Sequence, residues 1–494
     1  MWPCRKFRAI LPLVGFSFGL IALSADAQTR ILFYSDTEDY TCDESNDGIR
    51  DFARTMTDEG VRANFNIVGY LAMRIQEFGR KDVIDALKPH VLGTQSLYHS
   101  LHPTPAEYGD DPIYERSYRK ALMEESAAKA MVEAVFGEGR VRFAVHPGHS
   151  MSIGNIEAKV DIGVPLGIGG FVNCETGNLD MARPGPELDG LWYFNMYQAP
   201  YLTGTFHLEY LIPGESWYVP PERYKEIFDK LARYDLIGIG FHPHMQIKTK
   251  FWDGVNYRHG NQVKWREWNQ VPNRRPEHTA AFYENLRAFV RAMKADGRFR
   301  LTDFDEIERG VRPRMAVTMG ILPAFRRSLL ADFNCIRDPA SWSVADVFQA
   351  CVKFLRGEHE HRPGKAYGFL ERPRGVTSPV EVSAAGLRAA AAKLDLSTFL
   401  PPEVEVDGKR IGPADFLFAA LDVLTTGAEK TVARPREQLG SFKEIPSLEK
   451  FHLKGVWIHS KDFADTYTTE RFRLQLWTLR IDPVFGKAVS DNGL

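Results

Sequence analysis

The chain has 494 residues, apolar and charged fractions of 44% and 26%, and a formal net charge of −2. This length can bury a large core and indicates two or three domains. A nucleic-acid-binding protein normally carries a basic face or a high pI, so the charge balance disfavours a nucleic-acid partner.

The first 27 residues have the three parts of a secretory signal peptide. Basic residues between Arg5 and Arg8 precede an apolar run over residues 9–23, and Ala25 and Ala27 form a small-residue cleavage pattern. We therefore expect cleavage after Ala27 and a periplasmic or secreted product. An anchoring membrane helix is the alternative, but the run is short for a span. The sequence has no later stretch apolar enough to cross a membrane, so stable membrane insertion is not expected after cleavage.

Strand and helix patterns alternate through residues 28–312, which we expect to form one domain. The expected elements are a strand at 31–34, a helix at 46–59, a strand at 63–68, a helix at 81–88, a strand at 91–92, a helix at 114–136, a strand at 142–145, an apolar segment at 165–170, a helix at 221–234 and a strand at 236–241. This alternation predicts a parallel α/β fold, and we favour a closed or incomplete (β/α) barrel.

The alternation stops near Arg312, and residues 313–494 are predicted to form a separate, mainly helical region. The expected elements are helices at 343–356, 383–394, 413–424 and 469–479, with an extended arm at 401–411. Asp407 and Gly408 give this arm a turn signal.

Acidic and histidine-rich segments follow several of the expected strands. Asp36, Glu38 and Asp39 follow the first strand, and His242 and His244 follow the strand at 236–241. Because a parallel barrel gathers its active site at the carboxyl ends of its strands, we expect these side chains to converge.

A third such segment contains Gln95, His99 and His102, which are separated by four and three residues. On a helical turn each neighbouring pair would point to one side, which suits a common metal ion or substrate. Histidines that are hydrogen-bonded within a loop are the alternative interpretation.

Two further segments suggest contacts with a substrate. His146 and Pro147 follow the strand at 142–145, and residues 251–268 are dense in aromatic side chains, Trp252 among them. An aromatic wall can stack on the apolar face of a sugar. A loop whose rings pack only on one another is the alternative.

These residues resemble the polysaccharide deacetylases of carbohydrate esterase family 4, the NodB-homology fold. The likeness covers residues 31–312 and implies a deformed (β/α) barrel that holds a metal ion with one carboxylate and two histidines. Asp36 matches the family's catalytic base, and Glu38 or Asp39 matches the acid that binds metal. His242 matches the histidine that serves as catalytic acid.

The family's second motif, G-x-H-x-x-x-H, matches residues 93–99, so His99 is an implied metal ligand and Gln95 stands where the first histidine would be. An amide is a poorer zinc ligand than an imidazole. The resemblance implies a divalent ion, zinc before cobalt or nickel. Two ligand sets remain open: His102 replaces the missing histidine, or another group such as His242 or His244 does so.

The third motif usually carries an arginine beside a proline-rich turn. His146 and Pro147 keep the turn, and Arg142 is a displaced substitute for the arginine. Residues 313–494 have a fainter likeness to pseudomurein-binding repeats of cell-wall proteins, which implies a glycan- or wall-binding region.

The implied function is a secreted metal-dependent hydrolase that removes N- or O-acetyl groups from a polysaccharide or cell-envelope glycan. The expected site has Asp36 and His242 as catalytic residues, Glu38, Asp39, Gln95, His99 and His102 at the metal, and His146, Pro147, His244 and Trp252 at the substrate. The alternatives are another carbohydrate-active hydrolase on the same barrel, a carbohydrate-binding protein with a degenerate site, and a structural role in the envelope.

Overall fold

The computed structural model describes residues 28–164, 166–168, 193–194, 204–233, 236–265, 267–310, 316–336, 342–440 and 452–480. The predicted signal peptide at 1–27 and the predicted domain boundary at 312 lie outside these residues. Among the described residues, none of the helices combines the length and the apolar character that a membrane span needs.

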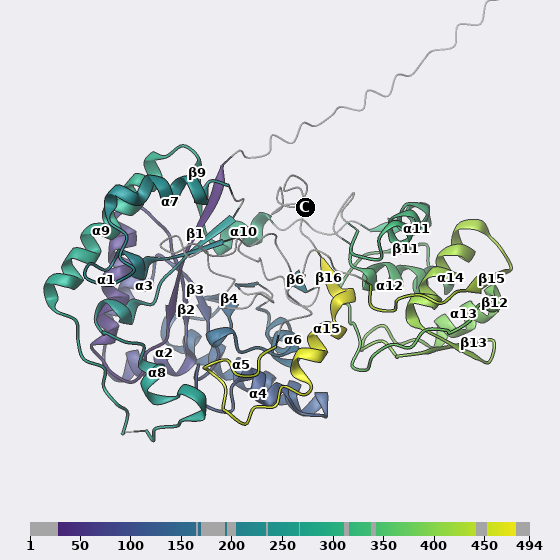
Figure 1. The fold of residues 1–494 in the computed structure, drawn as a ribbon, viewed down its shortest axis with the longest axis horizontal. Coiled ribbons are helices and arrows are strands. Elements are labelled where there is room, and N and C mark those ends of the chain that lie inside the picture. Colours follow the sequence, from purple (N-terminus) through teal and green to yellow (C-terminus); the bar gives the residue numbers. More distant parts are fainter. Residues whose placement is uncertain are drawn as a thin grey trace, which may run out of the picture.

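A parallel sheet forms the centre of the first part of the chain (Figure 1). Its strand order is β5-β4-β3-β2-β1-β8-β7, and β9 also pairs with β1. The strands are β1 (Thr29–Thr37), β2 (Asn64–Ile67), β3 (Val91–Thr94), β4 (Val141–Val145), β5 (Gly167–Ile168), β7 (Gly204–His207), β8 (Leu236–Gly240) and β9 (Phe299–Thr302). The predicted parallel α/β fold is confirmed, and barrel closure between β5 and β7 is not found in the described part of the chain.

Strand β1 has three neighbours along its length. Residues 29–32 pair with β9 and residues 30–33 pair with β8, whereas residues 34–37 pair with β2. Its apolar run Ile31, Leu32 and Phe33 is fully buried, as expected for a strand covered on both faces.

Helices cover the sheet, as the alternating pattern predicts. They are α1 (Ser45–Asp58), α2 (Gly69–Glu77), α3 (Lys81–Leu87), α4 (Pro105–Gly109), α5 (Tyr114–Phe136), α6 (Ile153–Asp161), α7 (Tyr224–Leu231), α8 (Trp252–Asn256), α9 (Pro276–Ala295) and α10 (Phe304–Gly310). In Figure 1, α1 and α9 lie on one side of β1, and the C-terminal part of the chain lies on the other.

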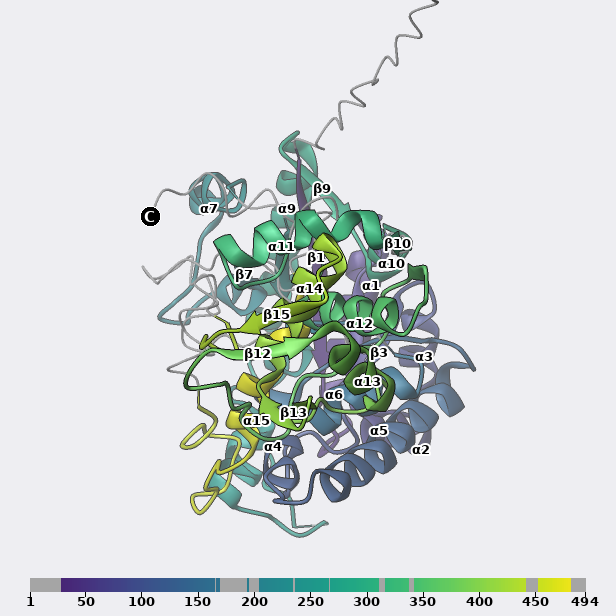
Figure 2. The same ribbon diagram turned by 90° about the vertical axis from the view of Figure 1, so that its right-hand side faces the viewer.

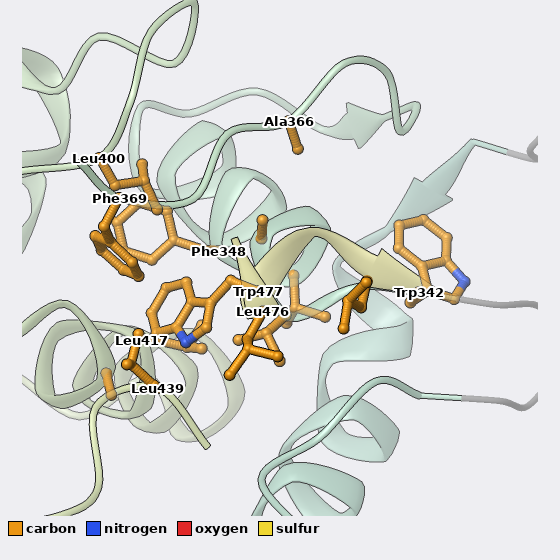
Figure 3. Close-up of a cluster of buried hydrophobic side chains, with 14 of the residues drawn as sticks. Trp342, Phe348, Ala366, Phe369, Leu400, Leu417, Leu439, Leu476 and Trp477 are labelled. Carbon is orange, nitrogen blue, oxygen red and sulfur yellow. The ribbon is translucent and has the colours of Figure 1, made fainter. Parts of the chain in front are cut away.

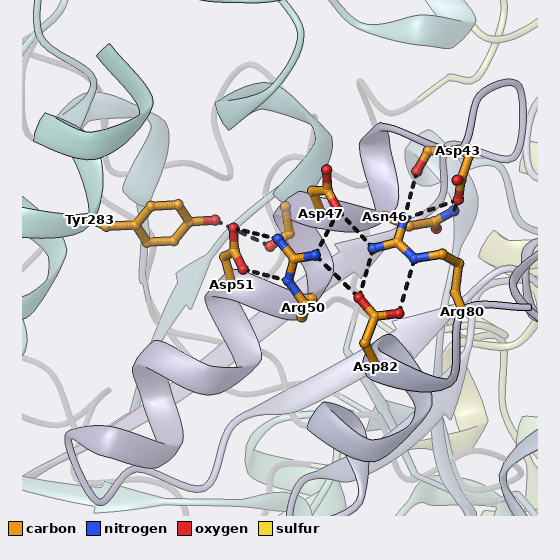
Figure 4. A network of polar contacts seen from close by, with 9 residues as sticks. Asp43, Asn46, Asp47, Arg50, Asp51, Arg80, Asp82 and Tyr283 are labelled. Atoms are coloured by element: carbon orange, nitrogen blue, oxygen red, sulfur yellow. Dashed lines mark hydrogen bonds and ion pairs between the residues drawn. The ribbon is translucent and has the colours of Figure 1, made fainter. Parts of the chain in front are cut away.

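A network of charged side chains joins α1 to α3 (Figure 4). Arg80 pairs with Asp43 at 3.0 Å, with Asp47 at 2.6 Å and with Asp82 at 3.0 Å, and Arg50 reaches Asp82 at 3.1 Å. The hydrogen bond from Arg80 is the main reason that the pKa of Asp82 lies well below its usual range. The network fixes the start of α1, which follows the acidic segment after β1.

The C-terminal part is mainly helical, as predicted, with several short strand pairs (Figure 2). Its helices are α11 (Leu322–Ala331), α12 (Val344–Leu355), α13 (Ala384–Lys393), α14 (Pro413–Thr426) and α15 (Thr468–Leu474). Its strand pairs are β10 (Val317–Thr318) with β11 (Glu360–His361), β12 (Val380–Ser383) with β15 (Lys430–Ala433), and β13 (Val404–Val406) with β14 (Lys409–Ile411), and β16 (Leu479–Arg480) pairs with β6 (Tyr193–Phe194). Asp407 and Gly408 form the turn between β13 and β14, both at positive φ.

Trp477 lies at the centre of the C-terminal core (Figure 3). Its ring is fully buried and lies 4.9 Å from the ring of Phe369 and 5.8 Å from that of Phe348. The same cluster of buried apolar side chains continues to Phe143 of β4 and Phe304 of α10. The two parts of the chain therefore share this cluster, whereas a second buried cluster lies within the first part alone.

Residues 452–468, the return segment, lead the chain back onto the loops that follow β3 and β4. The Ser460 amide donates to Glu107 at 2.6 Å, and Thr104 Oγ1 lies 3.1 Å from His459 Nδ1. Asp110 accepts hydrogen bonds from the backbone amides of residues 466–468 at 2.5–3.0 Å. One carboxylate from the first part of the chain thus caps the amino end of α15.

A substitution at Asp110 tests how much this cap contributes to the stability of the protein. Replacing Asp110 with Ala leaves three amides without their acceptor, and we expect the free energy of unfolding to fall by about 1–2 kcal/mol in urea denaturation. Asp58→Ala is the control, since Asp58 lies exposed on the surface. Equal stability of the two variants would contradict the capping role.

Candidate active site

The carboxyl ends of β1, β3, β7 and β8 meet at one edge of the sheet and bring polar side chains together. The Asp36 amide donates to the carbonyl of Phe241 at 2.8 Å, which joins the end of β1 to the end of β8. The Gln95 amide donates to the carbonyl of Ile67, which joins the end of β3 to β2. Convergence at the strand ends therefore follows from the parallel register.

His242 lies between two carboxylates. Its Nε2 is 3.3 Å from Asp36 Oδ2, and its Nδ1 is 2.7 Å from Glu209 Oε1. The backbone amide of His242 donates to the same Glu209 oxygen at 2.8 Å, and Asn66 donates to Asp36 Oδ1. The side chains of Asp36 and His242 are each 16% exposed, so a substrate can reach both.

These neighbours favour the protonated form of His242. Burial acts to lower the pKa of this imidazole, but the charge of Glu209 and the hydrogen bonds to Asp36 and Glu209 outweigh burial and raise the pKa well above its usual value. Burial acts to raise the pKa of Glu209, and the charge of His242 lowers it below its usual range. The geometry is that of a proton donor held by an anionic partner.

A second, fully buried group adjoins the first. Glu38 Oε2 is 3.0 Å from His99 Nε2, and Trp252 Nε1 donates to Glu38 Oε1 at 3.2 Å. On the other side of the ring, His99 Nδ1 is 2.7 Å from Ser100 Oγ and 3.5 Å from Asp253 Oδ2. Ser100 donates to Asp253 at 2.8 Å, which fixes the orientation of the imidazole.

The two carboxylates of this group have opposite pKa shifts. Burial raises the pKa of Glu38, but the charge of His99 and its hydrogen bond outweigh burial and lower the pKa to about 2. Burial and the charge of Glu38 raise the pKa of Asp253 to about 6. The repulsion between Glu38 and Asp253 is thus only partly offset by His99.

Several buried polar atoms at this edge have no hydrogen-bond partner among the described residues. They include Asp253 Oδ1, Gln95 Oε1 and both ring nitrogens of His244, and also Glu209 Oε2 and His207 Nε2. Burial lowers the pKa of His244, so its ring is kept neutral and able to donate a lone pair. Buried polar atoms are normally paired, and unpaired ones at one place indicate a missing ion or ligand.

A divalent cation fits this second group. One ligand atom each from Glu38, His99 and Asp253 lies within 4.8 Å of the others, and two oxygens with one imidazole nitrogen suit zinc or a similar ion. His207, Glu209 and His242 meet the same distance criterion. In that set, however, Nε2 of His242 is held by Asp36, which is not a member of the set, whereas both carboxylates that contact His99 belong to its own set.

Two residues expected at the metal have other partners. The oxygens of Asp39 accept from the Thr41 amide at 2.9 Å, from Thr41 Oγ1 at 2.6 Å and from Ser45 Oγ at 2.5 Å. His102 binds Glu107 at 2.7 Å through Nδ1 and the Tyr257 carbonyl at 3.1 Å through Nε2. The polar atoms of both side chains are therefore used in hydrogen bonds that stabilise loops, and they do not bind a metal ion.

The segment 95–104 does not form the helical turn on which a shared ligand face was expected. Ser96 and His99 have φ of 64° and 58°, in the left-handed region, and no helix is assigned to this segment. His99 therefore reaches Glu38 from a loop, and the expected alignment of Gln95, His99 and His102 on one helical face is wrong.

Three residues expected near the substrate are covered. His146 and Pro147 are buried, with His146 Nδ1 lying 3.1 Å from the ammonium group of Lys159, and Gly148 packs against Ile458 of the return segment. Trp252 is fully buried, so its ring cannot stack on a sugar. Trp252 packs against Tyr40 and Tyr257, with ring centroids 4.6 Å and 5.7 Å away.

Arg142, expected as a substitute for the third-motif arginine, lies at the other end of β4. It is the second residue of that strand and pairs with Glu308 of α10. It therefore takes no part in the candidate site.

Phe251 is the aromatic residue best placed to meet a ligand. It is 40% exposed, and its ring centroid lies 4.9 Å from that of His242 and 5.3 Å from that of His244. In the expected aromatic wall at 251–268, Trp252 and Tyr257 are core and Trp268 is partly buried, whereas Phe251 and Trp265 are exposed. Of the two exposed rings, Phe251 is the one that lies beside the two histidines.

Sequence reasoning missed Glu209 and Asp253. Glu209 follows β7 in a short turn, and the pair His207 and Glu209 at a strand end was its available signal. Asp253 lies in the five-residue helix α8, beside Trp252, where no acidic pattern marked it.

No family model and no curated protein matches the chain. Solved structures that it resembles include a CE4 family pseudoenzyme from Bacillus anthracis, at 13% identity over 56% of this chain and 65% of that one, with a TM-score of 0.32. They also include a probable polysaccharide deacetylase from Pseudomonas aeruginosa PAO1, at 12% identity over 57% of this chain and 91% of that one, with a TM-score of 0.36. A family 4 acetyl xylan esterase from Clostridium thermocellum in complex with a cobalt ion has 13% identity over 57% and 93% and a TM-score of 0.31. The backbone likeness is weak in each case, so the function is inferred from the side chains of the site.

The contact between Glu209 and His242 predicts a measurable change in protonation. In Glu209→Gln the anionic partner of Nδ1 is lost, so the pKa of His242 should fall toward its ordinary value. Histidine-selective NMR titration of protein kept free of metal by a chelator measures this shift. Glu222→Gln is the control, because Glu222 is an exposed acid, and it should leave the His242 titration unchanged. An unchanged titration in Glu209→Gln would show that Glu209 does not hold the proton on His242.

Proposed function

We propose that this chain is an exported, metal-dependent hydrolase that removes acetyl groups from a polysaccharide. The observation that carries this proposal is the adjacency of two groups at one sheet edge. One group consists of His242 and the two carboxylates that contact it, Asp36 and Glu209. The other is the buried group Glu38, His99 and Asp253. Export is proposed from the signal-like residues 1–27.

The first group supplies a base and an acid. Hydrolysis of an acetyl amide or ester needs a proton taken from water and a proton given to the leaving amine or alcohol. Asp36 is the base, because its side chain is partly exposed, its Oδ2 lies 3.3 Å from His242 Nε2 and Asn66 orients the carboxylate through Oδ1. His242 is the acid, and Glu209 keeps it protonated and correctly oriented.

The second group is the proposed metal site. A bound divalent ion would lower the pKa of a water molecule and polarise the acetyl carbonyl. Glu38, His99 and Asp253 would hold it, with His244 as a neighbouring neutral imidazole. A cation at this place would also relieve the repulsion between the carboxylates of Glu38 and Asp253.

Phe251 supports a glycan as the substrate. An exposed ring beside the catalytic acid gives a pyranose an apolar surface to stack on, and the acetyl group would then face Asp36 and His242. The positions of the acid and the ring favour an acetylated sugar over a free acetylated amine.

A glycan-binding protein without catalysis is the second candidate. Gln95 occupies the position where the resembled family has a histidine ligand, and its Oε1 is buried without a hydrogen-bond partner among the described residues. Loss of metal affinity at this position would leave a site that binds sugar but does not hydrolyse it.

Metal content tests the ligand set directly. The protein comprising residues 28–494, purified and dialysed against zinc, should carry one ion per chain in elemental analysis. His99→Ala and Asp253→Asn each remove a ligand and should lose most of the ion, whereas His278→Ala, a half-exposed histidine on α9, should retain it. Zinc retained in both site variants would overturn the assignment, and no zinc in the unmodified protein would favour the glycan-binding candidate.

Acetate release tests the reaction. On acetylated xylan and N-acetylated chitooligosaccharides, Asp36→Asn and His242→Asn should lower kcat by about 100-fold or more, because each removes a proton-transfer group. Their zinc content should remain that of the unmodified protein. Metal binding without acetate release from either substrate would indicate another hydrolase chemistry on this site.

A further inference from the structure

A cavity of about 730 Å³ opens at the amino-terminal edge of the sheet, at the opposite ends of the strands from the candidate active site. It is lined by residues that precede or begin three strands and by residues of α10. They are Arg62, Lys88, His90, Val91, Leu92, Gly139, Arg140, Arg142, Asp305, Glu308 and Arg309. This volume is in the range of small-molecule sites.

The walls of the cavity are held by the fold itself. Phe304 at the start of α10 stacks on Phe143 of β4, with ring centroids 4.2 Å apart and planes inclined by 7°. This contact fixes α10 against the sheet and places Asp305, Glu308 and Arg309 opposite the segments that begin β3 and β4.

The lining carries an excess of positive charge. Five cationic side chains face two carboxylates of the lining, and two further carboxylates outside it, Asp303 and Asp85, reduce the excess of positive charge from three to one. His90 adds none, because burial lowers its pKa to about 4. A concave site with one sign of charge concentrates small ions of the opposite sign.

The two carboxylates are already neutralised. Arg62 binds Asp305 at 2.5 Å and Asp303 at 3.1 Å, and Arg142 pairs with Glu308. These two arginines are therefore structural.

The remaining cations have no carboxylate of the cavity as partner. Arg140 donates to the backbone carbonyls of Lys88 at 3.1 Å and His90 at 3.0 Å, and among the described residues it has no ion pair. Arg309, at the carboxyl end of α10, makes no hydrogen bond or ion pair with any residue that the structure describes. Lys88 pairs with Asp85, which lies outside the lining.

We propose that this cavity binds a small ligand through a phosphate or carboxylate group, with Arg140 and Arg309 as its main contacts. The planar guanidinium presents paired N–H donors that match the two oxygens of such a group. Burial and the charge of Arg62 lower the pKa of Arg140, and the charge of Asp305 opposes them only in part, so a bound oxyanion would further favour the protonated guanidinium. The site is separate from the proposed catalytic edge and does not depend on the proposed function.

Isothermal titration calorimetry with the protein comprising residues 28–494 tests the proposal. The probes are inorganic phosphate and glucuronate, each at about 0.01 M ionic strength, where charge interactions are weakly screened. We expect saturable one-to-one binding of one probe, and the tighter probe identifies the ligand as a phosphate or a sugar carboxylate. Added sodium chloride should weaken this binding.

Three variants locate the site. Arg140→Ala and Arg309→Glu should each weaken binding by about tenfold or more, since each removes a charged hydrogen-bond donor. Arg54→Ala, an exposed arginine on α1, should stay within about twofold of the unmodified protein. Because Arg140 also holds two backbone carbonyls, Arg309→Glu decides the question if Arg140→Ala fails to fold.

Two results would overturn the proposal. One is the absence of saturable binding for both probes, and the other is unchanged affinity in Arg309→Glu. Zinc content and acetate release measured on the same variants should equal those of the unmodified protein, so failure of this site is distinguishable from failure of the proposed function.

Discussion

The site depends on the pairing of β1 with three other strands. The first half of β1 is fixed by β8 and β9 and its second half by β2, so the strand cannot shift in register without exposing Ile31, Leu32 and Phe33. This register places Asp36 in contact with His242 and Glu38 in contact with His99. A one-residue slip would turn both acids away from their partners. The arrangement of the site residues at the carboxyl edge therefore depends on the buried apolar residues of β1, which fix its register.

Much of the sheet and part of the site could be predicted because both follow from local patterns. Apolar runs marked most strands of the sheet but not β7 and β9, and acids or histidines after a strand marked Asp36, Glu38, His99 and His242. Glu209 and Asp253 come from a short turn and a five-residue helix, where periodicity gives no signal. Their positions are set by tertiary packing, which a single sequence does not reveal.

The expected residues that lie elsewhere differ from the others in burial and partners, not in residue type. Asp39 and His102 are as suitable for metal binding as Glu38 and His99, but neighbouring donors and acceptors occupy their polar atoms. Trp252 is a suitable sugar-stacking residue, but its ring is core and its indole nitrogen donates to Glu38. Residue type defines which chemistry is available, and packing decides whether it is used.

The return segment makes the final support of the site depend on residues that are translated long after the sheet. His459 and Thr104, which are in contact, are 355 residues apart in the chain, so the loops after β3 and β4 receive their final support long after the sheet has been made. Contacts of such separation form slowly because a long loop must first be closed. Until then the carboxyl edge of the sheet is bordered by unsupported loops. A nascent chain would therefore carry its candidate active site without this support until the return segment, residues 452–468, has been made.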